Sequence, residues 1–146
     1  MKITISVSGG YQEVFRNVQK ALADTSPFIR DTEKYYDGEV KKQFSNEGGI
    51  MNESRWRSLS PYTIAKRVKA GFGASPILVN TGRLKASIGK VQSNKKQLSF
   101  GSTVSYYRFH QLGTDKTPRR QILGLTNKLI KDISEIFKNY ILKSLG

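Results

Sequence analysis

The chain contains no cysteine and only one histidine among its 146 residues. The absence of cysteine excludes disulfide bonds, thiolate metal sites and cysteine nucleophiles. With His110 as the only imidazole, a conventional zinc site would need carboxylates for all its other protein ligands. The sequence therefore lacks much of the chemistry that metal sites and active sites use.

Long apolar runs are also missing. Residues 1–7 alternate apolar and polar side chains, whereas a signal peptide contains a continuous apolar run. No stretch approaches the roughly 18 apolar residues of a membrane span. We therefore expect a protein that is made and used in a cytoplasm, or in an assembly built there, without a membrane partner.

Acidic residues are scarce beside basic ones. The chain has 11 Asp and Glu against 25 Lys and Arg, for a net charge of +14. Residues 1–50 are neutral overall, whereas residues 51–120 carry 14 basic side chains and only 2 acidic ones, Glu53 and Asp115. This distribution predicts a scaffold with one electropositive region for an acidic partner: nucleic acid, an anionic membrane or an acidic protein. The alternative is a solvated surface without a partner.

Hydrophobic spacing predicts an N-terminal strand followed by two helices. Ile3, Ile5 and Val7 alternate with polar residues, as in a half-buried strand. Apolar residues then recur at helical spacing over residues 11–22 and again over residues 28–44. The polar side of the second helix mixes charges of both signs, as a solvated face does.

Three later helix starts carry capping signals. Ser26 precedes Pro27 and Ser60 precedes Pro61, and Thr126 precedes the last apolar stripe. A hydroxyl side chain accepts a hydrogen bond from the free N–H groups of a first helical turn, and proline fits the first helical position. We therefore place helix starts at these residues.

The remaining elements complete an α+β fold. A short basic helix is expected over residues 62–70, and alternation on both sides of a polar turn predicts a β-hairpin over residues 87–103. A long C-terminal helix follows Thr126 and is expected to pack on this small antiparallel sheet. We expect residues 1–146 to form a single domain.

The last helix carries apolar residues on two sides. One set falls within an arc of about 140°, wide enough for a core-facing stripe. This set consists of Leu129, Ile130, Ile133, Ile136, Phe137, Tyr140 and Ile141. Leu142 and Leu145 project from the opposite side. Either the helix frays and they fold back onto the core, or it continues and they contact another subunit. We favour the second, because no helix breaker precedes Leu145.

No catalytic constellation is apparent. Catalysis usually needs converging titratable groups, but no serine lies in a Gly-x-Ser-x-Gly elbow and no acidic pair lies near His110 in the sequence. The acidic residues are concentrated in the first third of the chain. Gly71-Phe72-Gly73 lacks the third glycine of a dinucleotide site and is typical of a flexible loop. We expect no enzyme, no cofactor and no metal, although folding would be able to assemble the carboxylates of a nuclease.

A basic cluster in the middle of the chain is the candidate polyanion-facing surface. Its members are Arg55, Arg57, Lys66, Arg67 and Lys69. Trp56 and Tyr62 lie among them, and single-strand-binding modules combine rings that stack on bases with cations that hold phosphates. A lone tryptophan three residues before a leucine is more often a core anchor, so we favour a core position for Trp56.

Short motifs in the second half occur in a recognisable order. They are Trp56-x-x-Leu59, Thr63-x-x-Lys66, Ile77-Leu78-x-x-Thr81-Gly82-x-Leu84-x-x-Ser87-Ile88, Gly101-Ser102, Tyr106-Tyr107-Arg108-Phe109-His110-Gln111-x-Gly113 and Pro118-Arg119-Arg120-x-x-Leu123-Gly124. This set resembles the phage virion morphogenesis family of Mu-like tailed phages. Tyr107 and Arg119 depart from it, because the family favours small residues there.

The resemblance implies a structural protein, without catalysis or cofactor, that joins a growing virion at the head–tail connector or tail end. The implied partners are other virion proteins near the DNA channel: connector, tail tube or terminator. A homo-oligomeric ring and a weak, non-specific DNA contact are further expectations. The protein would be made in the host bacterial cytoplasm and end in the head–tail region of the virion.

A structural loop is expected where the last two motifs meet. Its members are His110, Gln111, Gly113, Pro118 and Arg120. A histidine in this position is able to pin a loop through hydrogen bonds from its ring nitrogens.

Two other function classes stay open. One is a sequence-independent nucleic-acid-binding domain, and the other is a small phage nuclease. Phosphate binding weakens steeply with salt, by a slope of about −0.9 for each neutralised phosphate of B-DNA, whereas assembly through packed surfaces responds much less. Metal-dependent DNA cleavage would identify the nuclease.

Overall fold

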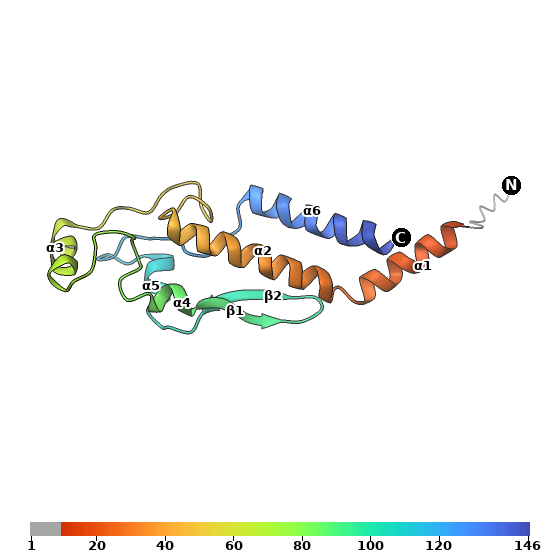
Figure 1. The fold of residues 1–146 in the computed structure, drawn as a ribbon, viewed down its shortest axis with the longest axis horizontal. Helices are drawn as coiled ribbons and strands as arrows, with labels where there is room; N and C mark the ends of the chain where they lie inside the picture. The colour runs from red at the N-terminus through yellow and green to blue at the C-terminus, as the bar shows by residue number, and fades with distance from the viewer. Residues whose placement is uncertain (1–9) are drawn as a thin grey trace.

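The computed structural model describes residues 10–146, so the strand expected around Ile3, Ile5 and Val7 lies outside the described residues. The described chain is elongated, with α1 at one end and α3 at the other (Figure 1). It is an α+β fold of six helices and one antiparallel two-stranded sheet. The elements are α1 (Gly10–Ala23), α2 (Ser26–Ser45), α3 (Pro61–Lys69), α4 (Arg83–Ser87), β1 (Ile88–Ser93), β2 (Leu98–Ser102), α5 (Tyr107–Leu112) and α6 (Asn127–Ser144).

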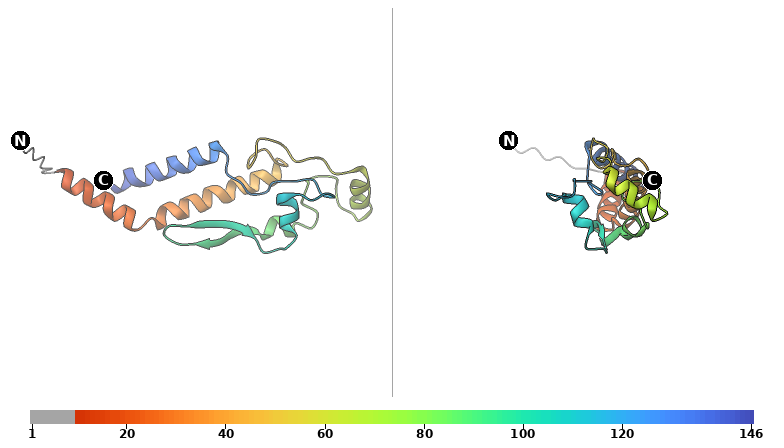
Figure 2. Two further views of the ribbon diagram at one scale, coloured as in Figure 1. Left: turned by 180° about the vertical axis from the view of Figure 1, so that it is seen from behind. Right: turned by 90° about the vertical axis from the view of Figure 1, so that its left-hand side faces the viewer.

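The long helix α2 forms the middle layer. Helix α6 lies along one side of α2 and the hairpin along the other, and both views agree on this order (Figures 1 and 2). Phe28 of α2 meets Phe137 of α6 edge to face, with ring centroids 5.1 Å apart. On the opposite side, Tyr36 meets Phe100 of β2 at 4.6 Å. The expected packing of the C-terminal helix on the sheet is therefore wrong, because α2 lies between them.

The hydrophobic core lies around the C-terminal half of α2. Its buried members are Tyr36, Val40, Phe44, Met51, Trp56, Ile77, Leu84, Ile88, Ile122, Leu123 and Leu129. The rings of Phe44 and Trp56 meet edge to face at 5.5 Å, an arrangement that aromatic quadrupoles favour. The preference for a core position of Trp56 is confirmed.

The helix starts follow the capping signals closely. The hydroxyl of Ser60 accepts a hydrogen bond from Thr63 N at 3.2 Å, and that of Thr126 accepts one from Leu129 N at 3.3 Å. The second helix begins one residue earlier than expected, with Thr25 as its N-cap. The physical reason is that Ser26 bonds to Asp24 Oδ1 through both its hydroxyl and its amide.

The β-hairpin lies within the expected residues 87–103 and is fastened to α2. Ile88 pairs with Ser102 and Ser93 with Leu98, with a bulge between Lys90 and Gln92. Lys90 Nζ lies 2.9 Å from a carboxylate oxygen of Glu33 on α2. This ion pair thus links the hairpin to α2.

Helix α5 was not expected from the sequence. It begins in the aromatic-rich segment and ends where Gly113 takes a φ of 78°. A Cβ at Gly113 would come within 2.9 Å of Arg119 N, so only glycine lets the chain turn back this tightly.

Among residues 10–146, no helix is both long and apolar enough to cross a membrane.

Candidate functional site

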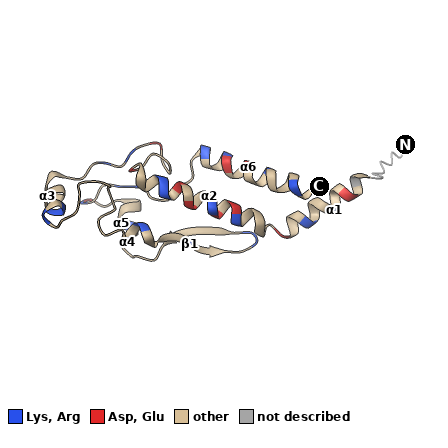
Figure 3. Ribbon diagram, viewed as in Figure 1, with Lys and Arg blue, Asp and Glu red and all other residues tan. Residues whose placement is uncertain are grey.

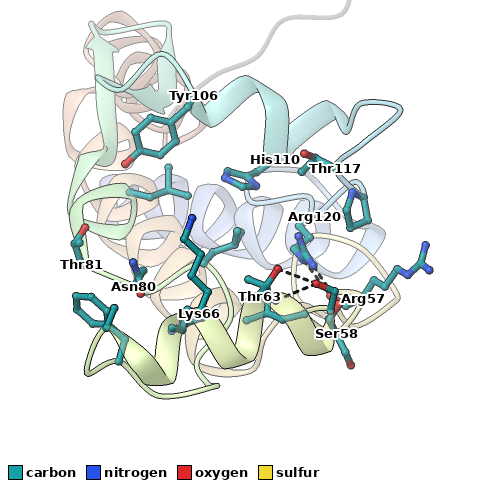
Figure 4. Close-up of a pocket in the computed structure, with 18 of the residues that line it drawn as sticks. Arg57, Ser58, Thr63, Lys66, Asn80, Thr81, Tyr106, His110, Thr117 and Arg120 are labelled. Carbon is teal, nitrogen blue, oxygen red and sulfur yellow. Dashed lines mark hydrogen bonds between the residues drawn. The ribbon is translucent and has the colours of Figure 1, made fainter.

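A pocket of about 1050 Å³ opens between α3, α5 and the loop that precedes Arg120 (Figure 4). Its cationic lining residues are Arg57, Lys66, Arg67, Lys116 and Arg120, and His110 also lines it. No Asp or Glu of the described chain takes part in the lining. We call this feature the basic pocket.

Helix α3 contributes one wall of the basic pocket. The Ser60 cap and Pro61 start the helix, and its only charged residues are the three basic ones in its last turn. Lys66 is exposed, whereas Arg67 is only 9% exposed. The Arg67 guanidinium donates to Pro76 O at 3.4 Å and to Val79 O at 3.2 Å, so it fastens the 76–79 segment to the helix.

Arg120 forms the opposite wall and is 5% exposed. Its Nε donates to Arg57 O at 3.0 Å and its Nη2 to Ser58 O at 3.3 Å, the bonds drawn in Figure 4. Burial and the nearby charge of Arg57 lower the pKa of Arg120 from its usual value. The side chain therefore joins the segment before α3 to the loop after α5 and keeps an uncompensated charge there.

His110 projects toward the same space from α5 (Figure 4). Its main-chain oxygen accepts a hydrogen bond from Arg120 N at 2.7 Å. Its Nδ1 is buried and has no hydrogen-bond partner among the described residues. Burial, and then the charge of Arg120, lowers the pKa of His110 below 6.5. The main chain of His110, rather than the Nδ1 atom, thus holds the loop.

Gln111 supplies the side-chain bonds that His110 does not. Its Oε1 accepts from Ile122 N at 2.8 Å and Leu123 N at 3.0 Å, and its Nε2 donates to Leu123 O at 2.7 Å. Pro118 lines the basic pocket just before Arg120. The residues expected to form a structural loop therefore lie together around His110. They are Gln111, Gly113 at the tight turn, Pro118 and Arg120.

The structure gathers some of the expected basic residues and separates others. Arg57, Lys66 and Arg67 share the basic pocket, whereas Arg55 and Lys69 do not line it. Arg67 is also buried, so it does not offer a free surface charge to a polyanion.

Two features of the structure were missed in the sequence, and one of them belongs to the basic pocket. Lys116 lines the pocket, and its place in a basic, proline-containing loop was the only signal for it. Gln43 is 0% exposed and shapes the base of the 50–51 loop, because its Oε1 accepts from Ile50 N and Met51 N. The sequence feature that could have indicated its burial is its position three residues after Val40, on the apolar side of the helix.

Charge compensation differs between α2, in the middle of the molecule, and α3, at one end (Figure 1). Helix α2 carries both signs, whereas α3 shows only basic residues (Figure 3). Asp37 pairs with Lys41 at 2.6 Å. None of the ion pairs found within residues 10–146 includes a cation of the basic pocket. The same residues contain no group of three His, Asp or Glu side chains placed to hold a metal.

The other end of the molecule exposes apolar side chains. Phe15 of α1 is 61% exposed and Leu142 of α6 is 54% exposed. Helix α6 runs to Ser144. The alternative in which the helix frays before Leu142 and the two leucines fold back onto the core is therefore wrong for Leu142. Leu145 is the C-cap residue and is partly buried. Tyr140 holds the two helices together, since its hydroxyl lies 2.9 Å from Ala21 O and 2.6 Å from Asp24 O.

Comparison with known proteins places the chain in a family. No curated protein and no solved structure matches it. The model of the phage virion morphogenesis family matches residues 9–142. That match begins just before α1 and ends inside α6, and therefore includes both the basic pocket and the apolar end. The chain thus belongs to the phage virion morphogenesis family.

Proposed function

We propose that this member of the family is a non-enzymatic assembly protein that acts at the head–tail connector or at the tail end. In this role it binds other virion subunits near the DNA channel. The observation that carries the proposal is the division of the elongated surface into two ends. The end around α3 presents the basic pocket together with exposed apolar side chains such as Tyr62 and Val68, and the other end presents exposed apolar residues on α1 and α6 without such a pocket.

The two ends suit two different contacts. Exposed side chains such as Phe15 and Leu142 gain free energy when a neighbouring subunit removes them from water. The basic pocket favours a partner with negative charge. A protein that joins virion components needs two separate binding surfaces, and this distribution supplies them.

The absence of catalysis is part of the proposal. The single histidine has a lowered pKa because burial and Arg120 disfavour its charged form. Several acidic side chains of α2 are held in ion pairs, such as Glu33 with Lys90, and none of them lines the basic pocket. These placements support a binding role for the basic pocket.

Deletion of the gene from its phage genome tests the assembly role. We expect DNA-filled heads and separate tails, or tails of abnormal length, in electron micrographs of lysates. Complementation with the wild-type gene should restore joined particles. Normal yields of infectious particles from the deletion would overturn the proposal.

A sequence-independent nucleic-acid-binding role is the second candidate. It is favoured by the exposure of Arg55, Arg57, Lys66 and Lys69 close to one another along the chain. Binding of duplex DNA should then weaken with a slope of about −0.9 per neutralised phosphate in a plot of log affinity against log salt. Replacing Lys66 and Lys69 with glutamine should reduce that slope, whereas an unchanged slope would remove these residues from the candidate.

A further inference from the structure

We propose that the basic pocket receives an acidic segment of a neighbouring virion subunit, a peptide in which Asp or Glu side chains alternate with apolar ones. The inference rests on the proposed function, because virion assembly supplies the neighbouring subunit. It adds the chemistry of the contact and the residues that make it.

The charge of the basic pocket is not balanced from within the chain. Arg67 and Arg120 are both buried, and their hydrogen bonds go to main-chain carbonyls rather than to carboxylates. Carbonyl oxygens orient a guanidinium but leave its net charge in place. Glu47 attracts Arg67 electrostatically, but its Oε1 accepts bonds from Ser75 and Ile77, and it does not line the pocket. A buried cluster of like charge therefore favours any anion that enters.

Two buried polar atoms at the pocket also lack partners. Arg67 Nε and His110 Nδ1 make no hydrogen bond within the described chain. An unpaired buried polar atom is costly, so native proteins rarely keep one without a use. Both side chains line the basic pocket, but the two atoms themselves are closed to solvent, so an incoming group would bond to them only after a shift of these side chains.

The walls between the cations are suited to a peptide. Leu59, Leu78, Leu84 and Phe72 line the pocket beside the basic residues. Apolar walls offer burial to side chains such as leucine or phenylalanine, whereas a DNA backbone gains nothing from them. The cations are also gathered in one concavity, while duplex DNA is held by charges spread along its length. These features favour an acidic, partly apolar peptide over DNA.

A second copy of this chain is a poorer occupant. Each copy has a net charge of +14, so two copies repel each other outside any local contact. Several of its acidic residues, such as Glu33 and Asp37 of α2, already pair with lysines of the same chain. Charge complementarity therefore indicates a different, acidic subunit.

Binding of a model peptide tests the inference directly. The probe is a fluorescein-labelled hexapeptide that alternates glutamate with leucine, and its control replaces each glutamate with glutamine. Fluorescence anisotropy with the full chain should show binding of the glutamate peptide only. A short duplex DNA and inorganic phosphate serve as competitors. If DNA displaces the peptide and binds more tightly in the same pocket, the acidic-peptide assignment is wrong.

A matched pair of triple variants locates the binding. Arg57→Gln, Lys66→Gln and Lys116→Gln remove three exposed cations of the basic pocket and spare the buried arginines. We expect the affinity for the glutamate peptide to fall about tenfold. The control variant carries Arg16→Gln, Lys131→Gln and Lys143→Gln, which remove the same charge from α1 and α6. Equal losses in the two variants would show general charge attraction and overturn the inference.

The single histidine gives a readout that needs no mutation. His110 is the only histidine, so its ring produces one assignable signal in a proton NMR titration. An anionic peptide in the basic pocket should raise the pKa of His110 from its lowered value, because it offsets the charge of Arg120. A pKa that does not change at saturating peptide would place the peptide elsewhere.

The inference and the proposed function fail in different ways. If the triple pocket variant rescues the gene deletion fully and the peptide does not bind, the inference is wrong and the assembly role stands. If the deletion itself gives normal virions, the assembly role is wrong whatever the peptide does.

Discussion

Gln43 is buried in α2, and its amide bonds to main-chain groups of two segments that are far apart in the sequence. Oε1 accepts from Ile50 N at 2.8 Å and Met51 N at 3.1 Å, and Nε2 donates to Gln121 O at 2.7 Å. A buried polar side chain with all its groups satisfied specifies one arrangement of its neighbours. Gln43 thereby sets the position of both segments against the helix.

Replacement of Gln43 by leucine should therefore be strongly destabilising. The variant keeps the volume but leaves the main-chain N–H groups of Ile50 and Met51 without partners, and each unpaired group costs about 1–3 kcal/mol. We expect a loss of about 3 kcal/mol in the free energy of unfolding, measured by urea denaturation. Gln19→Leu makes the same chemical change at an exposed position of α1 and should cost less than about 0.5 kcal/mol. Similar losses in the two variants would contradict this role of Gln43.

His110 should make the stability of the protein depend on pH. Its pKa in the folded state lies below 6.5, so the unfolded state binds more protons in the range just below that value. The free energy of unfolding should be constant above about pH 6.5 and should fall as the pH falls through the folded pKa. Urea denaturation at several pH values, compared between wild type and His110→Gln, measures this contribution. A wild type that loses no more stability than the variant on acidification would count against the lowered pKa.

At the scale of helices and strands, the sequence predicted the features that depend on residues close to one another along the chain. The caps at Ser60 and Thr126 and the hairpin turn were predictable, because each depends on neighbours within a few residues. Helix α5 was not, since it has no side-chain cap and no buried residue. The side of α2 on which α6 packs was also not predictable, because it depends on contacts such as Phe28 with Phe137 across the fold.

The N-cap of α6 tests one of these locally determined features. Thr126→Ala removes the hydroxyl that accepts from Leu129 N, and the loss of such a cap typically costs about 1 kcal/mol. Thermal or urea unfolding should show a loss of that size. Thr103 is exposed and its hydroxyl makes no hydrogen bond in the described chain, so Thr103→Ala should change stability little. A reversed order of the two effects would contradict the capping role.

Leu142 tests whether α6 carries a subunit contact. Leu142→Ser alters an exposed side chain of an intact helix, so we expect a change in monomer stability below about 0.5 kcal/mol. Self-association in sedimentation velocity, or rescue of the gene deletion, should weaken. Leu129→Ala is the matched core variant and should cost about 2–5 kcal/mol. A large stability loss in Leu142→Ser, with unchanged association, would assign Leu142 to the core instead.

At the scale of the whole molecule, the basic pocket combines residues from distant parts of the chain. Arg57, Lys66 and Arg67 lie close together in sequence, and their composition alone marked them as a basic cluster. Their union with Lys116 and Arg120 depends on the loop after α5 folding back across the segment before α3. That union is a tertiary contact, and sequence spacing carries no signal for it.

At the same scale, α1 packs on α6 but adds little to the core. Its buried residue Ala21 lies outside the cluster of core residues around α2. Removal of residues 1–23 should therefore cost less than the loss of one core leucine, about 2 kcal/mol. Circular dichroism melting of the truncated chain measures this, and the His110 NMR signal reports whether the basic pocket persists. A truncated chain that is unfolded at room temperature would show that α1 is essential to the core.

The carbonyl of Gln121 accepts hydrogen bonds from both Gln43 and Trp56, which are made much earlier during synthesis. A nascent chain that ends before this residue has no acceptor for either donor and lacks Ile122, Leu123 and Leu129 of the core. Its aromatic residues Phe44 and Trp56 then remain exposed while the ribosome completes the last part of the chain. Partly made copies should thus be prone to aggregation. We therefore expect the core to close only after Leu129 has left the ribosome, which delays folding until most of the chain has been made.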